Sequence, residues 1–102
     1  MLIVLDQIDA ETTAILRAPM AMPHGAALQV ISLEHVLGGG DALRLTLSLA
    51  LSDEARTGAV ADWLWDRLED AAPLVIRIGG TRARVAEAAA LAWLIDRARG
   101  EG

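Results

Sequence analysis

The chain has 102 residues, is 54% apolar and carries a formal net charge of −5, with no cysteine. This length suits a single domain with one core, and the lack of cysteine excludes disulfides and thiolate chemistry. No apolar run reaches the roughly 18 residues of a membrane-spanning segment, and an acidic chain does not support general nucleic-acid or anionic-membrane binding.

We expect one domain over residues 1–102. Within it, residues 1–26 supply one or two strands and a proline-rich loop, and residues 27–99 supply the core. The chain starts without the basic residues of a signal peptide and reaches Asp6 at once, so we expect a cytoplasmic location. Its composition is rich in alanine and has no lysine, which suggests a bacterial source with a GC-rich genome.

Residues 2–5 are typical of a short strand, and residues 6–18 are ambiguous. They can pair as a strand or form a short helix that starts at Asp9. The β-branched residues Thr12, Thr13 and Ile15 favour the strand. Two prolines and a glycine make residues 18–25 a loop.

Residues 43–52 alternate leucine with small or polar residues, which predicts a half-buried strand whose leucine face points inward. The apolar stretch of residues 27–36 predicts the strand before it, so that the two form a hairpin. A helix is expected over about residues 54–70, because its apolar residues recur at spacings of three and four. We expect Ser52 or Asp53 to cap it.

Two runs of strand-forming residues, 73–78 and 81–85, flank Gly79-Gly80 and predict a β-hairpin with a two-residue turn. Such a turn determines the cross-strand pairs. The expected pairs are Ile78–Thr81, Arg77–Arg82, Ile76–Ala83, Val75–Arg84 and Leu74–Val85. A final helix is expected over residues 87–99 and is predicted to end at Gly100.

These elements predict an α+β fold. It is an open-faced two-layer sandwich, in which an antiparallel or mixed sheet carries two helices on one face. From Leu43 onward the order of elements resembles a ferredoxin-like, split βαβ unit that lacks its last strand. That resemblance implies that residues 43–52 and 73–78 run parallel. Residues 27–36 can fill the place of the missing strand, as in a circularly permuted variant.

The glycine-rich residues 37–43 resemble the cofactor-attachment motif of carrier proteins, but Ala42 stands where that motif needs a serine. They also lack the Lys-Ser/Thr pair and the following helix of a phosphate-binding loop. We therefore interpret this segment as a hairpin loop and expect no cofactor.

His24 and His35 are the two histidines of the chain. One lies in the proline-rich loop and the other in a predicted strand, so a metal or catalytic site would need carboxylates brought in by folding. The sequence therefore predicts no catalytic residue and no metal ligand. One hypothesis still uses these histidines, namely a small ligand-binding or enzymatic ferredoxin-like dimer with one of them at the mouth of a cavity.

Four arginines, Arg44, Arg77, Arg82 and Arg84, are expected to share the uncovered face of the sheet with small polar residues. One interpretation is a solvated face that keeps the sheet in water. The other is a docking surface for an acidic partner, or for a second copy whose acidic N-terminal half is complementary. Residues 1–42 contain one arginine and five carboxylates.

The tryptophans are the second possible contact. Trp63 belongs to the buried stripe of its helix, but Trp65 lies about 200° around from Trp63, and Trp93 lies about 200° around from Leu91 on the last helix. Trp65 and Trp93 are therefore expected at the flank or on the outside of their helices. There they can bind a partner or cover a groove between helices.

The sequence favours a non-catalytic protein–protein interaction or adaptor module, an accessory component of a bacterial system that forms homo-oligomers. Its expected partner is itself or another protein, without nucleic acid or membrane. A second hypothesis is an acidic immunity protein or antitoxin that covers a basic toxin.

Overall fold

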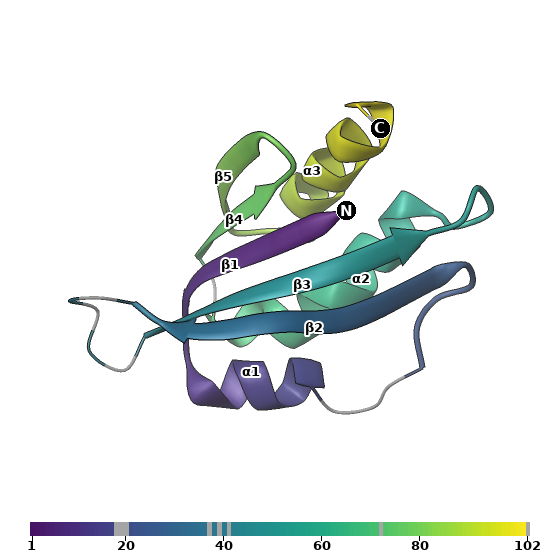
Figure 1. Ribbon diagram of the computed structural model, residues 1–102. Coiled ribbons are helices and arrows are strands. Elements are labelled where there is room, and N and C mark those ends of the chain that lie inside the picture. The colour runs from purple at the N-terminus through teal and green to yellow at the C-terminus, as the bar shows by residue number, and fades with distance from the viewer. Residues whose placement is uncertain (18–20, 37, 39, 41, 72, 102) are drawn as a thin grey trace.

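The computed structural model describes residues 1–17, 21–36, 38, 40, 42–71 and 73–101. Within these residues, three α-helices and one five-stranded antiparallel sheet form an α+β fold (Figure 1). The elements in chain order are β1 (Leu2–Ile8), α1 (Ala10–Arg17), β2 (Ala26–His35), β3 (Leu43–Leu51), α2 (Thr57–Leu68), a 3₁₀ turn (Glu69–Ala71), β4 (Leu74–Ile78), β5 (Thr81–Val85) and α3 (Ala88–Glu101).

The strands lie in the order β2-β3-β1-β4-β5, and all neighbours are antiparallel. β3 and β4 therefore run in the same direction, as expected, but β1 lies between them (Figure 1). In the unit expected from Leu43 onward, β5 would take that central position. Instead β5 forms an edge of the sheet, so the prediction that a ferredoxin-like unit starts at Leu43 was wrong. β2 does pair with β3 as the predicted hairpin.

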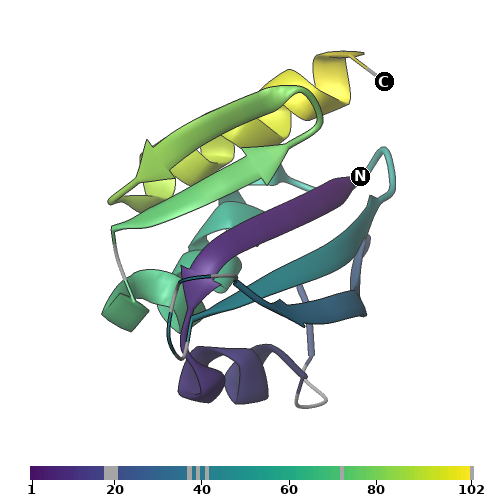
Figure 2. The ribbon, with the colours of Figure 1, turned by 60° about the vertical axis from the view of Figure 1, so that its left-hand side comes forward.

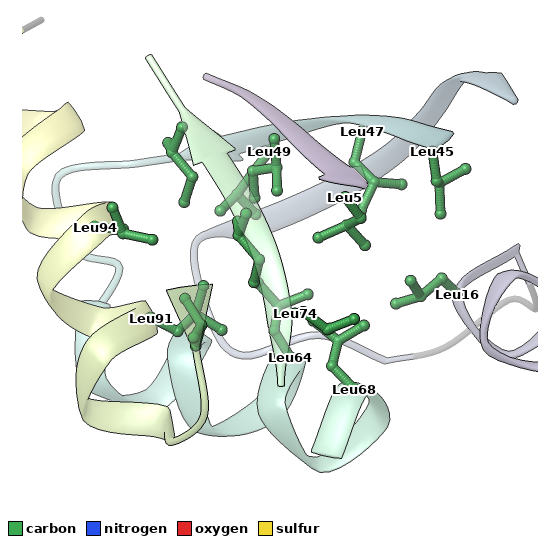
Figure 3. Close-up of a cluster of buried hydrophobic side chains, with 14 of the residues drawn as sticks. Leu5, Leu16, Leu45, Leu47, Leu49, Leu64, Leu68, Leu74, Leu91 and Leu94 are labelled. Atoms are coloured by element: carbon green, nitrogen blue, oxygen red, sulfur yellow. The ribbon is translucent and has the colours of Figure 1, made fainter. Parts of the chain in front are cut away.

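The core lies on one face of the sheet. In β3, Leu43, Leu45, Leu47 and Leu49 are at most 9% exposed, and the corresponding residues of β1 and β4 are at most 3% exposed. α2 and α3 cover this face (Figure 2), and α1 adds Leu16 to the same cluster, as Figure 3 shows. In the part of the chain that the structure describes, no helix lies over the opposite face of the sheet, and we call it the open face. The two expected helices are thus joined on the core face by a third.

The β4–β5 hairpin has the predicted register in all five pairs. Gly79 has a φ of 59°, the positive value that the first central residue of a type II′ turn requires. Leu74, Ile76 and Ile78 are buried, whereas Arg77 is exposed on the other face. The predicted division of this hairpin into an aliphatic face and an arginine face is confirmed.

The preference for a strand was wrong for residues 10–17, because α1 begins directly after Asp9, whereas residues 6–8 do belong to the strand β1. The Thr12 N–H donates to Oδ1 of Asp9 over 2.7 Å, and the Thr13 hydroxyl donates to the Asp9 carbonyl over 3.0 Å. Thr12, Thr13 and Leu16 are buried on one face of the helix. N-capping and burial at helical spacing therefore outweigh the β-propensity of the threonines.

The predicted start of α2 was also wrong. The helix begins at Thr57, and neither Ser52 nor Asp53 caps it. The preceding loop is tied instead to residues distant in sequence. The Ser52 N–H donates to the Gly25 carbonyl over 2.8 Å, and Gly25 has a φ of 81°. A Cβ atom at Gly25 would collide with the Ser52 hydroxyl.

Arg99 holds the same loop from the other side. Its Nη1 donates to the Ala55 carbonyl over 2.8 Å and to the Thr57 hydroxyl over 3.1 Å, and its Nη2 donates to the Ser52 carbonyl over 3.2 Å. α3 continues through Gly100 to Glu101, so Gly100 does not end the helix as expected. The predicted loop residues 18–20, 37, 39 and 41 lie outside the described residues.

Candidate interaction surface

The pairing of the strands brings the four predicted arginines onto the open face. We call Arg44, Arg77, Arg82 and Arg84 the arginine surface. All four side chains are exposed. One row across the sheet contains Arg82, Arg77, Val4, Thr46 and Ser32. The next row contains Arg84, Val75, Asp6, Arg44 and Glu34.

Arg44 already has an acidic partner within its own chain. Its Nε donates to Oδ1 of Asp6 over 2.7 Å, and Glu34 stands opposite Arg44 in the β2–β3 register. The hydrogen bond to Asp6, and then the charge of Asp6, raise the pKa of Arg44 above its ordinary value. The positive charge of Arg44 is therefore compensated within its own chain.

Arg77, Arg82 and Arg84 differ from Arg44. Within the described residues, no hydrogen bond or ion pair binds any of these three side chains. Arg77 and Arg82 are directly opposite each other on β4 and β5, an arrangement of like charges that destabilises a strand pair. These three side chains form a positive cluster that the folded monomer leaves uncompensated.

The structure does not bring the candidate tryptophans to the arginine surface, because α2 and α3 cover the other face of the sheet. Trp65 is half-buried and packs against the core. Trp93 is 54% exposed, and the Arg97 guanidinium lies 5.5 Å from its ring centroid. Of the two, Trp93 is the one that stands out from its helix.

An acidic feature of α2 escaped the sequence-based prediction. Asp62 and Asp66 are exposed one turn apart, and Glu69 and Asp70 continue the line in the 3₁₀ turn. We call these four residues the acidic ridge. The spacing of four residues from Asp62 to Asp66 and from Asp66 to Asp70 was visible in the sequence and places these aspartates on one side of a helix.

The two histidines lie at opposite ends of β2 and cannot share a ligand. His24 precedes the strand, and its Nε2 lies 2.7 Å from Oε2 of Glu54. Both side chains are more than three-quarters exposed, and they border a shallow hollow of about 350 Å³. His35 ends the strand opposite Leu43. Among the described side chains, no group of three metal-binding residues comes together.

Comparison of the chain with protein-family models, with curated proteins and with solved structures finds no match. Over the described part of the chain, no helix is long and apolar enough to cross a membrane. The class of protein defined by this geometry is a small α+β domain with one helix-covered sheet face and one open, arginine-bearing face. Function has to be inferred from that open face.

Proposed function

We propose that this protein is a non-catalytic protein–protein interaction module, an adaptor that docks an acidic surface of its partner onto the arginine surface. The observation that carries the proposal is the cluster of Arg77, Arg82 and Arg84. These three side chains lie together on an uncovered sheet face, with no carboxylate bound to them among the described residues. In a chain of net charge −5, such a concentration of positive charge favours an acidic partner.

The chemistry of arginine suits this role. Its planar guanidinium binds a carboxylate through two parallel hydrogen bonds and loses little freedom in doing so. The strands that carry the cluster are fixed by the core on the other face, so the arginines are displayed on a rigid support. Val4 and Val75 lie between the charged positions and can contact apolar groups of a partner.

We further propose that residues 2–78 form a ferredoxin-like unit, to which β5 and α3 are an addition. Two features support this proposal. The first six elements follow the β-α-β-β-α-β order of that fold, and their strands lie in the order β4-β1-β3-β2. Homo-oligomerisation, a role in a bacterial system and a cytoplasmic location stay predictions from the sequence.

A second candidate function is an acidic immunity protein or antitoxin. The acidic ridge of α2 favours it, because exposed carboxylates in a line suit a basic toxin surface. Neutralising Asp62 and Asp66 should then abolish protection against the toxin, while changes on the open face should leave protection intact. The ligand-binding hypothesis has less support, since His24 and Glu54 are open to solvent.

The proposed function is tested with a short polyglutamate peptide as the acidic probe. We expect the protein to bind polyglutamate at low ionic strength, and salt to weaken this binding. The double variant Arg82→Glu/Arg84→Glu should bind at least about tenfold more weakly. It should stay folded by circular dichroism, because both side chains are exposed.

The matched control is Arg17→Glu/Arg56→Glu, which makes the same change of net charge at two exposed arginines away from the open face. The control should retain most of the binding. Absence of binding by the unmodified protein, or equal losses in the two variants, would contradict the proposed function.

A further inference from the structure

We infer that the acidic partner of the arginine surface is α2 of a second copy, so that the protein associates head to tail. The inference rests on the proposed function of the arginine surface. It adds the identity of the docked element, which is the acidic ridge formed by Asp62, Asp66, Glu69 and Asp70.

The ridge points away from its own molecule. α2 buries Val60, Ala61, Leu64 and Leu68 against the core, and the turn of the helix places Asp62 and Asp66 on the opposite side. Both aspartates are exposed, as are Glu69 and Asp70. The carboxylates are thus presented to solvent on a rigid helix.

The one basic side chain within α2 is turned back onto the helix. The guanidinium of Arg67 lies 3.8 Å from the ring centroid of Trp63, and its Nη1 donates to the Trp63 carbonyl over 2.7 Å. Trp63 is in turn fixed by its Nε1, which donates to the Ala21 carbonyl over 2.9 Å. The positive charge of Arg67 is therefore held on the flank of α2, beside the ridge.

The spacing of the two surfaces matches. Residues one helical turn apart, such as Asp62 and Asp66, are separated by about 6 Å along the helix axis. Residues two apart on a strand, such as Arg82 and Arg84, are separated by about 6.7 Å. A helix lying along β5 can therefore place two successive carboxylates against two successive guanidinium groups, with Arg77 alongside on β4.

The two surfaces belong to opposite sides of the molecule. The arginine surface is on the open face of the sheet, whereas α2 lies on the other face (Figure 2), and its acidic ridge is opposite the side that α2 buries. One copy can use both surfaces at once, each toward a different neighbour. Contacts of this kind are heterologous and give rings or open chains in place of closed dimers.

A symmetric dimer through two open faces is less favourable. If the two-fold axis is perpendicular to the strands, β5 lies over β5 and the arginines of both copies meet. If the axis is parallel to the strands, β5 lies over β2, where Glu34 is the carboxylate that faces the cluster. Pairing through the β2 edge is disfavoured by the bulge around Ile31.

The test uses two neutralised variants of the whole chain. Arg82→Gln/Arg84→Gln removes charge from the arginine surface, and Asp62→Asn/Asp66→Asn removes charge from the acidic ridge. Their controls are Arg17→Gln/Arg56→Gln and Glu11→Gln/Glu87→Gln, at exposed positions outside both surfaces. Light scattering measures the average mass over a range of concentrations and of salt.

The average mass of the unmodified protein should rise with concentration beyond that of a dimer and fall as salt is added. Each neutralised variant should associate at least about tenfold more weakly. An equimolar mixture of the two variants should give a dimer and nothing larger, because each retains one working surface. Both controls should behave like the unmodified protein.

A strict monomer at all concentrations overturns the inference, as does an Asp62→Asn/Asp66→Asn variant that assembles normally. If the arginine variant alone loses assembly and Glu34→Gln also weakens it, the contact is instead the symmetric dimer. In each of these cases the proposed function still stands if polyglutamate binding depends on Arg82 and Arg84. It falls if that binding is unaffected.

Discussion

The two faces of this sheet are built by the same strands, yet they are under different physical demands. On β4, Leu74, Ile76 and Ile78 are at most 3% exposed, while Arg77 between them is exposed on the open face. The core face is packed against helices, where each side chain is constrained in size and shape. On the open face, Arg77, Arg82 and Arg84 are exposed and, among the described residues, have no hydrogen-bond or ion-pair partner, so packing does not constrain them in the same way.

The contrast also shows where stability is given up. Placing Arg77 opposite Arg82, with Arg84 nearby, adds like-charge repulsion that a pair of threonines would avoid. No described carboxylate relieves it. Packing explains the leucines and isoleucines of the core face, whereas for the arginine cluster we propose contact with a partner.

The largest expected effect is a difference in stability between substitutions at two adjacent residues of β4, one on each face of the sheet. Ile76→Ala should lower the free energy of unfolding by about 2–5 kcal/mol, because it leaves a cavity in a fully buried site. Its neighbour on the open face is the control, and Arg77→Ala should change stability by less than about 0.5 kcal/mol. Urea denaturation measures both. Similar losses in the two variants would mean that the open face is also needed for folding.

A smaller effect is expected where the helix layer is tied to its loop. Arg99→Met removes the three hydrogen bonds to Ser52, Ala55 and Thr57 and should cost about 1–3 kcal/mol. Arg56→Met changes an exposed arginine beside the same loop and should be nearly neutral. Equal unfolding midpoints in urea for these two variants would show that Arg99 does not hold the loop.

The parts of the fold that were predictable are the local ones. The β4–β5 register follows from a two-residue turn, and the faces of β3 follow from strict alternation, so the positions of the four arginines followed as well. The sheet order was not predictable, because β1 pairs with strands about 40 and 70 residues further along the chain. A short apolar run such as residues 2–5 does not specify its neighbours.

The errors at helix ends have the same origin. Ser52 and Asp53 have the composition of an N-cap, but hydrogen bonds from Arg99 and to Gly25 hold that segment as a loop. Those partners are distant in sequence, so no local pattern shows them. The acidic ridge is the opposite case, since the spacing of its aspartates is visible in the sequence, whereas the role that we propose for it depends on the arginine cluster of the folded protein.

The smallest expected effect concerns α1, where the β-propensity of the threonines conflicts with the N-cap signal of Asp9. Asp9→Ala should lower the free energy of unfolding by about 1 kcal/mol, because the cap of α1 is lost, while Asp9→Asn keeps an acceptor and should lose less. Urea denaturation at neutral pH measures both losses. Equal losses in the two variants would contradict the role of the Asp9 side chain as a cap.

The pH dependence of the free energy of unfolding is a second way to measure the contribution of the Asp9 cap. Hydrogen bonds from the Thr12 side chain, and then from its backbone, lower the pKa of Asp9 in the folded protein. This contribution to stability is complete above the unfolded-state pKa of about 4 and is lost as the pH falls through the lower folded value. Between neutral pH and pH values below about 4, the unmodified protein should therefore lose more stability than Asp9→Asn, in which this position no longer titrates. If both lose the same amount, the negative charge of Asp9 adds nothing to the cap beyond the acceptor oxygen that asparagine also provides.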